Sequence, residues 1–582
     1  MAPNNNSPLF ASGRPSSSNS EERAAAEDDA LLGNRRKNSY EAKRPGFWRE
    51  IGLFTWAVVA TAAVIVLGVL LSQSHQAPKK TKQNGKRNLI FMVSDGMGPA
   101  SLSLTRSFRQ FQGDLPIDDI LQLDQHFIGS SRTRSSSSLV TDSAAGATAF
   151  SCGRKSYNGA ISMLPDHTPC GTVLEAAKRA GYTTGYIEGL TPPVVVTTDI
   201  TDATPACFAS HVDYRMQEDS IALQEVGEHP LGHRVVDLML GGGRCHFLPN
   251  TSESSCRADD RDVTKLAQDK YGWTYIDNRE DFDELKLGKK VQLPLLGLFS
   301  DTDIPFELDR RNMNDVYPSL DEMARTALTA LEAATKDSDK GFFLMIEGSR
   351  IDHAGHGNDP AAQVHEVLAY DRAFQSVIDF LNKSDTEGAL VATSDHETGG
   401  LAVARQLNPS YPQYLWYPEV LANASHSSEY LSRVLRAHVA SSEAIANGRP
   451  VSRRFVKEDL IKKGLGVMDA SEEEIDRVLD NPALSAYAFA DIISRRAQIG
   501  WSTHGHSAVD VNIYGYGADV LRGNHENIEV GKFLRDYLNV DVDAITAELN
   551  SKTNGQSLSA ASTPGVPDFG RYEERLKKNL PQ

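Results

Sequence analysis

The feature that most constrains this chain is an apolar stretch, residues 51–71, that contains no charged side chain. It is long enough to cross a hydrocarbon core of about 30 Å as a single helix. Basic side chains crowd its N-terminal flank, so the positive-inside rule places residues 1–50 in the cytosol. The alternatives are a buried core helix and a cleaved signal peptide, which begins nearer the first residue and usually has a shorter apolar region. We expect a type II signal anchor, followed by a polar linker at 72–87.

The tail before this stretch carries a sorting pattern. Residues 1–40 are rich in Ser and Asn and then acidic, without apolar periodicity, which predicts disorder. Within them Glu27, Leu31 and Leu32 resemble an acidic dileucine signal, although so short a pattern also arises by chance. Clathrin-type adaptors read such signals on cytosolic tails bound for lysosomes or vacuoles. The tail therefore predicts a sorting adaptor as a partner.

The chain beyond the apolar stretch suits an oxidising lumen. Cys245 and Cys256 flank a short loop, and this spacing is compatible with a disulfide. Three further cysteines, whose pairing the sequence leaves open, are Cys152, Cys170 and Cys207. The acceptor sequences for N-linked glycans are at Asn250, Asn382 and Asn423. The C-terminal segment 549–582 is polar and has no apolar tail that a lipid anchor would replace.

Length and charge narrow the classes of function. With 582 residues, the part beyond the anchor has room for one large α/β domain or for two to three ordinary ones. Hydrophobic residues make up 40% of the chain, which is typical of globular proteins. The formal net charge of -17 argues against nucleic-acid binding, which needs a basic surface. An acidic protein that handles anions must concentrate positive charge locally, and bound metal is one way to do so.

Short apolar runs alternate with segments of helical spacing. The runs expected to form strands are 88–94, 183–187, 235–240, 341–346, 389–393 and 511–514. The expected helices include 172–180, 319–334 and 360–381. This order predicts an α/β domain with a mostly parallel sheet covered by helices on both faces. Ligands of such sheets bind beyond the carboxyl ends of the strands.

Carboxylates and histidines gather after the expected strands. They are Asp95, Glu347, Asp352, His356, Asp395, His396 and His504. A single acidic residue at a strand end is more often a turn former or helix cap. Seven such groups from five segments are hard to explain by capping, and carboxylate and imidazole are ligands that zinc takes. The pattern therefore predicts a metal centre.

A second cluster has the composition of an anion site. Ser143 is followed by small residues at an expected helix N-terminus, where free N–H groups and the helix dipole favour an anion. The plainer interpretation makes Asp142 or Ser143 an ordinary N-cap. Arg215, the first arginine after the Asp202-Ala203-Thr204 segment, is the basic group expected to hold the same anion.

Six motifs together resemble those of alkaline phosphatases, in the same order. They are 95–98 (DGMG), 141–148 (TDSAAGAT), 202–205 (DATP), 347–356 (EGSRIDHAGH), 393–396 (TSDH) and 503–505 (THG). The resemblance spans about residues 88–545, with a catalytic domain expected at 88–548. With the anchor and the sorting tail, the chain resembles most the membrane-anchored, repressible vacuolar members of fungi. The resemblance also implies a crown-like insertion at about 405–500 and a homodimer.

The resemblance implies a role for each matched residue. The first zinc would be held by Asp352, His356 and His504, and the second by Asp95, Asp395 and His396. Magnesium would be held by Asp95, Asp202, Thr204 and Glu347. His506 is expected to be a decoy beside His504. Ser143 would be the nucleophile, and Arg215 would clamp two phosphate oxygens, a task for which a planar guanidinium suits better than Lys.

The function expected is hydrolysis of phosphate monoesters at alkaline pH through a phosphoserine intermediate, in the vacuole lumen. One alternative is a related two-metal phosphodiesterase or sulfatase, which commonly uses Thr or a modified Cys as nucleophile. Another is a luminal binding module without activity, which would be expected to lack at least one ligand. Ser143, Arg215 and the oxygen-rich third site favour the monoesterase. Asp202 is the residue typical of bacterial members of the family, whereas His353 is typical of animal members. This combination leaves the identity of the third metal open.

Overall fold

The computed structural model describes residues 51–52, 54–62, 85–182, 193–440 and 452–552. The chain divides into two units, Met1–Gln83 and Asn84–Gln582. In the first unit, residues 51–52 and 54–62 are helical. Among the described residues, no helix is both long enough and apolar enough to cross a membrane. The tail signal, the rest of the expected anchor, the strand expected at 183–187 and most of the C-terminal tail lie outside the described residues.

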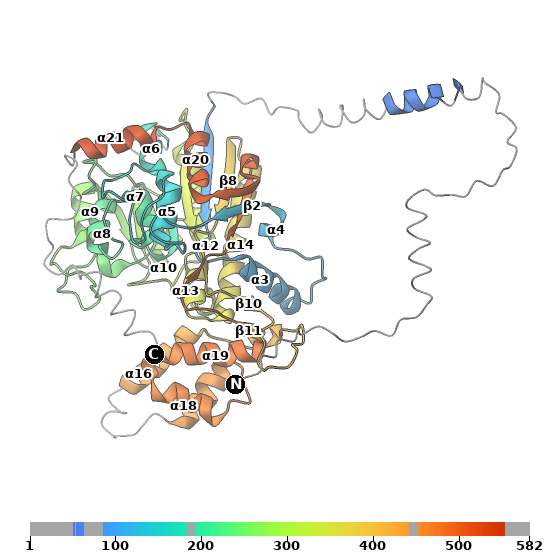
Figure 1. The fold of residues 1–582 in the computed structure, drawn as a ribbon. Helices are drawn as coiled ribbons and strands as arrows, with labels where there is room; N and C mark the ends of the chain where they lie inside the picture. Colours follow the sequence, from blue (N-terminus) through green and yellow to red (C-terminus); the bar gives the residue numbers. More distant parts are fainter. Residues whose placement is uncertain (1–50, 53, 63–84, 183–192, 441–451, 553–582) are drawn as a thin grey trace, which may run out of the picture. The chain divides into compact units, whose positions relative to one another are not determined.

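A sheet of ten strands forms the centre of the second unit (Figure 1). Its strand order is β14-β2-β13-β8-β1-β7-β3-β4-β6-β5. All neighbouring pairs are parallel except those that β13 makes with β2 and β8. The strands are β1 (Arg87–Val93), β2 (Phe127–Arg132), β3 (Val194–Asp199), β4 (Leu238–Gly242), β5 (Thr274–Ile276), β6 (Leu295–Leu298), β7 (Phe343–Glu347), β8 (Glu387–Thr393), β13 (Val511–Tyr516) and β14 (Gly523–Glu526). The predicted α/β fold with a mostly parallel sheet is confirmed.

Both faces of the sheet are buried, because side chains alternate between the two faces and helices cover each face. In β1, Leu89 and Phe91 join one core and Ile90 and Met92 join the other. The helices over the first core are α5 (Ser143–Cys152), α6 (Val173–Arg179), α7 (Ala203–Ala209), α8 (Glu218–Val226), α9 (Val263–Tyr271), α20 (Asn527–Leu538) and α21 (Val542–Lys552). Those over the second are α3 (Pro99–Gln112), α4 (Gln122–Gln125), α10 (Arg279–Glu284), α12 (Leu320–Ala334), α13 (Arg350–His356) and α14 (Pro360–Lys383).

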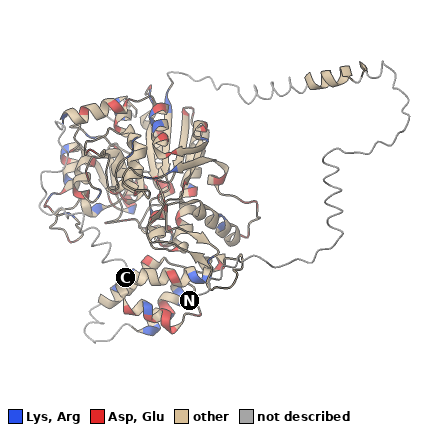
Figure 2. Ribbon diagram, in the orientation of Figure 1, with Lys and Arg blue, Asp and Glu red and all other residues tan. Residues whose placement is uncertain are grey.

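A helical subdomain follows β8 in the sequence and has its own apolar core. It contains α16 (Ser428–Ala440), the π-helix η2 (Phe455–Lys462), α18 (Glu472–Asp480) and α19 (Ser485–Ala497), which lie together at the lower end of the unit in Figure 1. The Ser471 side chain caps α18 by accepting from the Glu474 N–H. Acidic and basic side chains are interspersed over these helices (Figure 2). The subdomain occupies the region expected to be an insertion, and its role as a crown stays a prediction.

Four of the five cysteines form two disulfides. Cys245 pairs with Cys256, as the spacing allowed. Cys152 pairs with Cys170, which resolves the pairing that the sequence left open. Cys207 is free and buried in α7. Burial raises the pKa of its thiol to about 12, so it stays protonated and unreactive at ordinary pH.

Candidate functional site

Parallel strands bring polar side chains to one edge of the sheet. β1 pairs with β7 and with β8, and the last residues of all three strands are in register. Glu347 ends β7, Asp95 lies just beyond β1, and Asp395 and His396 follow β8. All four residues are buried, with His396 and Asp395 at 0% exposure. Segments far apart in the sequence therefore meet in one buried cluster at the carboxyl edge.

The buried acids of this cluster carry excess negative charge. Burial, followed by repulsion from Asp395 and other carboxylates, raises the pKa of Asp95 well above its ordinary value. Burial also raises the pKa of Glu347 to about 8 and that of Asp395 to about 7. Buried oxygens without a hydrogen-bond partner within the described part of the chain include Asp95 Oδ1, Asp395 Oδ2 and Thr204 Oγ1. Such orphaned oxygens fit a divalent cation, which would supply the missing positive charge.

Ser143 lies at the first position of α5 with its hydroxyl directed to this cluster. Its Oγ is 3.0 Å from Nε2 of His396. Asp142 caps the helix by accepting from the Ala145 N–H. Helix α5 packs closely on the segment that follows β8, since a Cβ on Gly146 would lie 2.9 Å from the Asp395 Cβ. The small residues after Ser143 thus allow the helix N-terminus to reach the carboxylates.

A second group of ligand-type side chains lies beside the first. Asp352 and His356 lie on α13, where the His356 Nε2 is 3.2 Å from the Asp352 Oδ2. His506 completes the group, with its Nε2 3.2 Å from the His356 Nε2 and 3.8 Å from the Asp352 Oδ1. Ligand atoms of Asp352, His396 and His506 lie close enough to hold one ion, as do those of Asp95, Asp395 and His396. The two groups share His396.

The structure corrects the choice between two histidines, because His506 lies at the cluster and His504 does not. Strand β12 (His506–Ser507) pairs with β9 (Glu397–Thr398), directly after His396, and stacks the two imidazoles at 3.5 Å. His504 belongs to the preceding turn. Its Nδ1 lies 2.9 Å from the His356 carbonyl oxygen and its ring contacts Tyr487. His506, taken from the sequence as a decoy, is the ligand candidate.

Arg215 lies between two carboxylates, one of which, Asp142, precedes the serine and caps its helix. It donates from Nη2 to Asp202 Oδ1 over 2.6 Å, and its Nη1 lies 3.6 Å from Asp142 Oδ2. The Asp202 side chain also caps α7, the helix in which Thr204 is buried. The guanidinium is therefore held over the N-terminus of α5, where an anion bound at Ser143 would meet it. The structure brings together ten of the eleven predicted site residues, all except His504.

Two further contacts at the site carried no recognisable signal in the sequence. The Ser349 hydroxyl donates to Glu347 Oε2 over 2.8 Å and so orients that carboxylate. His353 Nδ1 lies 3.1 Å from Asp303 Oδ2. Burial lowers the pKa of His353, but the charge of Asp303 outweighs it and raises the pKa to about 9. Asp303 comes from the loop after β6, and only the order of strands in the sheet reveals its proximity.

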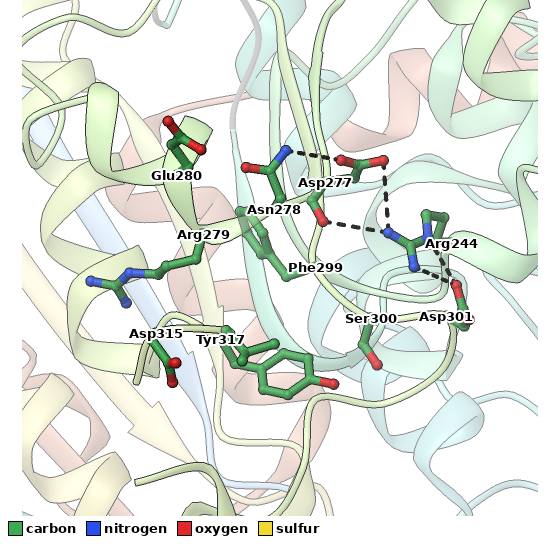
Figure 3. A pocket seen from close by; sticks show the side chains of 11 residues that line it. Arg244, Asp277, Asn278, Arg279, Glu280, Phe299, Ser300, Asp301, Asp315 and Tyr317 are labelled. Carbon is green, nitrogen blue, oxygen red and sulfur yellow. Dashed lines mark hydrogen bonds and ion pairs between the residues drawn. The ribbon is translucent and has the colours of Figure 1, made fainter. Parts of the chain in front are cut away.

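A separate cavity of about 530 Å³ lies farther along the same edge, beyond β4, β5 and β6 (Figure 3). Arg244 occupies one side of it, donating to Asp301 over 2.6 Å and lying 3.7 Å from Asp277. Phe299 and Tyr317 line it as well. None of the predicted site residues borders this cavity, so the cluster around Ser143 is the candidate active site.

Known proteins share this chain's sequence and fold. Residues 86–540 match the family model described as alkaline phosphatase. The chain is 54% identical over 551 residues to the repressible alkaline phosphatase of Saccharomyces cerevisiae, a match that covers 89% of this chain and 94% of that protein. It is 48% identical over 522 residues to the alkaline phosphatase of Schizosaccharomyces pombe, covering 88% and 91%. The alkaline phosphatase structure from Thermus thermophilus matches with a TM-score of 0.63 and 27% identity over 82% of this chain and 98% of that one.

Proposed function

Because the chain belongs to the alkaline phosphatase family, whose members hydrolyse phosphate monoesters, we propose that Ser143 is its nucleophile and that the reaction passes through a phosphoserine. The observation that carries this proposal is the buried contact between the Ser143 hydroxyl and His396, inside the cluster of ligand-type side chains. A serine hydroxyl needs activation to attack phosphorus.

The chain's own groups suit binding of a phosphoryl group. Arg215 offers N–H donors in a fork that matches two phosphate oxygens, and its contacts with Asp202 and Asp142 hold it in place. The N-terminus of α5 presents backbone N–H groups to the same anion. The Ser143 hydroxyl lies between these donors and His396, so an ester bound there has its phosphorus next to the attacking oxygen.

We propose two zinc ions and one magnesium ion. The residues that would hold the first zinc are Asp352, His356 and His506, and those for the second are Asp95, Asp395 and His396. Those for magnesium are Asp95, Asp202, Thr204 and Glu347, all of which offer oxygen, the ligand magnesium prefers. When bound, the ions would supply Lewis acidity and neutralise charge on the phosphoryl oxygens. The orphaned oxygens of Asp95, Asp395 and Thr204 support this assignment.

A substrate comparison tests the proposal against a two-metal phosphodiesterase or sulfatase. The full-length protein in detergent is assayed with 4-nitrophenyl phosphate, bis(4-nitrophenyl) phosphate and 4-nitrophenyl sulfate, before and after chelation and after zinc and magnesium are restored. We expect the monoester to be the best substrate, chelation to abolish its hydrolysis and the two metals to restore it. Faster hydrolysis of the diester or the sulfate would overturn the proposal.

We also propose that the protein is a single-pass type II protein of the vacuole membrane with its catalytic unit in the lumen. The uncharged stretch 51–71, its basic flank and the pattern of Glu27, Leu31 and Leu32 support this. Changing both leucines to Ala should redirect the protein to another membrane without altering its activity. Protease treatment of sealed vesicles should cleave the tail and spare the glycosylated catalytic unit. A protected tail would contradict the topology.

The family likeness also supports a homodimer. Sedimentation of the detergent-solubilised protein should give the mass of two chains. A monomer with full activity would overturn this part of the proposal.

A further inference from the structure

A cavity of about 280 Å³ lies between the helical subdomain and the catalytic cluster. Arg477 of α18 and Tyr487 and Asp491 of α19 line one side. Trp501 and His504, which follow α19 in the chain, line the other. Its volume is close to the lower limit of about 300 Å³ for small-ligand pockets. His504, which the metal cluster does not use, is therefore a wall of this cavity.

The cavity reaches the active site through His504, which forms one of its walls. A series of contacts leads outward from the serine, through His396 and His506 to His356, whose carbonyl oxygen lies 2.9 Å from Nδ1 of His504. Exposure of the imidazoles increases along this series, from 0% for His396 to 13% for His506 and 40% for His356. In phosphoryl transfer the attacking and leaving oxygens lie roughly in line. We therefore expect the alcohol of an ester attacked by Ser143 to leave on the exposed side of these imidazoles.

The charged groups of the cavity leave positive charge in excess. Arg477 Nη1 donates to Asp491 Oδ2 over 2.9 Å, and Arg405 Nη1 lies 3.5 Å from the other oxygen of Asp491. One carboxylate thus faces two guanidinium groups, each of which has five N–H donors. The Arg477 side chain is 50% exposed, so its remaining donors are accessible to a ligand. An anionic group is the ligand that these arginines would take.

Neighbouring side chains give the cavity fixed, flat walls. The Trp501 Nε1 donates to the Ser494 hydroxyl over 3.0 Å, which fixes the indole ring. The Tyr487 ring packs edge-on against His504 at 4.4 Å. Within the described part of the chain, no hydrogen bond to the Tyr487 hydroxyl or to Nε2 of His504 is formed. These two polar atoms remain free for the hydroxyl groups of a sugar-like alcohol.

We propose that this cavity is a leaving-group subsite for phosphate monoesters whose alcohol carries a second phosphate. Arg477 and Arg405 bind the second phosphate, while Tyr487, Trp501 and His504 surround the part that joins it to the ester. This inference rests on the proposed phosphatase activity and adds a preference among its substrates. The preference comes from the helical subdomain, which no residue of the metal cluster belongs to.

Fructose 1,6-bisphosphate and fructose 6-phosphate test the subsite, because both are sugar monoesters and only the first carries a second phosphate. Initial rates of phosphate release give the ratio of their kcat/KM values for the full-length enzyme in detergent. Arg477→Ala should lower this ratio about tenfold, the loss expected for one charge-assisted contact, while kcat/KM for fructose 6-phosphate stays within about twofold. Asp491→Asn, which removes the competing carboxylate, should raise the ratio.

Arg453→Ala is the matched control. Arg453 lies in the same subdomain, is 46% exposed and pairs with Glu472, but it does not line the cavity. It should leave the ratio unchanged. Calorimetry on Ser143→Ala protein, with and without Arg477→Ala, should show tenfold weaker binding of the bisphosphate when the arginine is absent. A ratio and an affinity unchanged by Arg477→Ala overturn the subsite alone, whereas no hydrolysis of either sugar ester by the unaltered enzyme overturns the proposed function.

Discussion

Replacing Glu175 by Gln should destabilise the catalytic unit by breaking a fully buried charge network. The Glu175 Oε1 lies 2.9 Å from Nε2 of His211 and 3.2 Å from Nε2 of His229, and all three side chains have 0% exposure. His229 accepts the Leu231 N–H at Nδ1, so its Nε2 carries the proton. His211 faces acceptors at both nitrogens, since its Nδ1 lies 3.1 Å from the Ser162 carbonyl oxygen. His211 is therefore an imidazolium paired with the Glu175 carboxylate.

The size of the expected loss of stability follows from the contacts that a Gln side chain at position 175 can still make. A Gln carbonyl can still accept the Thr172 N–H that now donates to Glu175 Oε2 over 2.7 Å. The charged contact with His211 is lost, and losing one partner of a buried ion pair costs about 3–5 kcal/mol. His211 limits this cost by releasing its proton, so we expect about 3 kcal/mol. That is a large share of the roughly 5–15 kcal/mol by which domains are stable.

The pKa shifts set the pH range of the effect. Burial raises the pKa of Glu175, but the charges and hydrogen bonds of both histidines outweigh it and depress the pKa, so its contribution is lost as pH falls below the unfolded value of about 4.3. Burial lowers the pKa of His211, but Glu175 outweighs it and raises the pKa, so that contribution is lost as pH rises through the folded value. Burial lowers the pKa of His229 to about 4, and its preference for the neutral form stabilises less as pH falls below about 6.5.

Urea unfolding of the detergent-solubilised protein, followed by tryptophan fluorescence, measures the difference between Glu175→Gln and the unaltered chain. The difference should be largest between about pH 5 and 6.5 and should decrease toward alkaline pH, where His211 is neutral in both proteins. Glu548→Gln, at a partly exposed pair with Arg179, is the control and should change stability little. A loss below about 1 kcal/mol, or one that does not vary with pH, would refute the imidazolium assignment.

Three further variants examine the active site. His506→Ala should remove about one metal ion per chain, measured by plasma mass spectrometry, and nearly all activity, whereas His504→Ala should retain the metal; the reverse result would reinstate the choice made from the sequence. Arg215→Ala should raise KM for 4-nitrophenyl phosphate, weaken inhibition by phosphate and lower kcat/KM by roughly a hundredfold or more; unchanged phosphate inhibition would mean that another cation holds the anion. Asp202→Asn should lower the magnesium content and make activity depend on added magnesium, and a full magnesium content would exclude Asp202 from the third site.

The sequence predicts most of the candidate site because parallel strands align their carboxyl ends. Apolar runs locate β1, β7 and β8, so the acids that follow them, Asp95, Glu347 and Asp395, are expected to converge. Which of His504 and His506 joins the cluster cannot be predicted in this way. It depends on the pairing of β12 with β9, two strands of two residues each that carry no periodic signal.

Other features depend on contacts between segments distant in the sequence. Glu175, His211 and His229 share no motif, because each belongs to a different segment and only the packed fold brings them together. The free thiol of Cys207 is likewise decided by geometry, since Cys152 and Cys170 are the pair that lies within bonding distance. The cavity beside His504 requires the placement of α18 and α19 against the sheet domain, which apolar periodicity does not reveal.

Trapping the covalent intermediate tests the central claim most directly. The full-length protein is mixed with a phosphate monoester at acid pH, where breakdown of a phosphoserine is expected to be slow, then quenched and digested for mass spectrometry. We predict one phosphoryl group on Ser143, none in the Ser143→Ala variant, and full labelling in the control Ser136→Ala, at an exposed serine of the preceding loop. A phosphoryl group on another residue, or labelling that persists in Ser143→Ala, would contradict the assignment of the nucleophile.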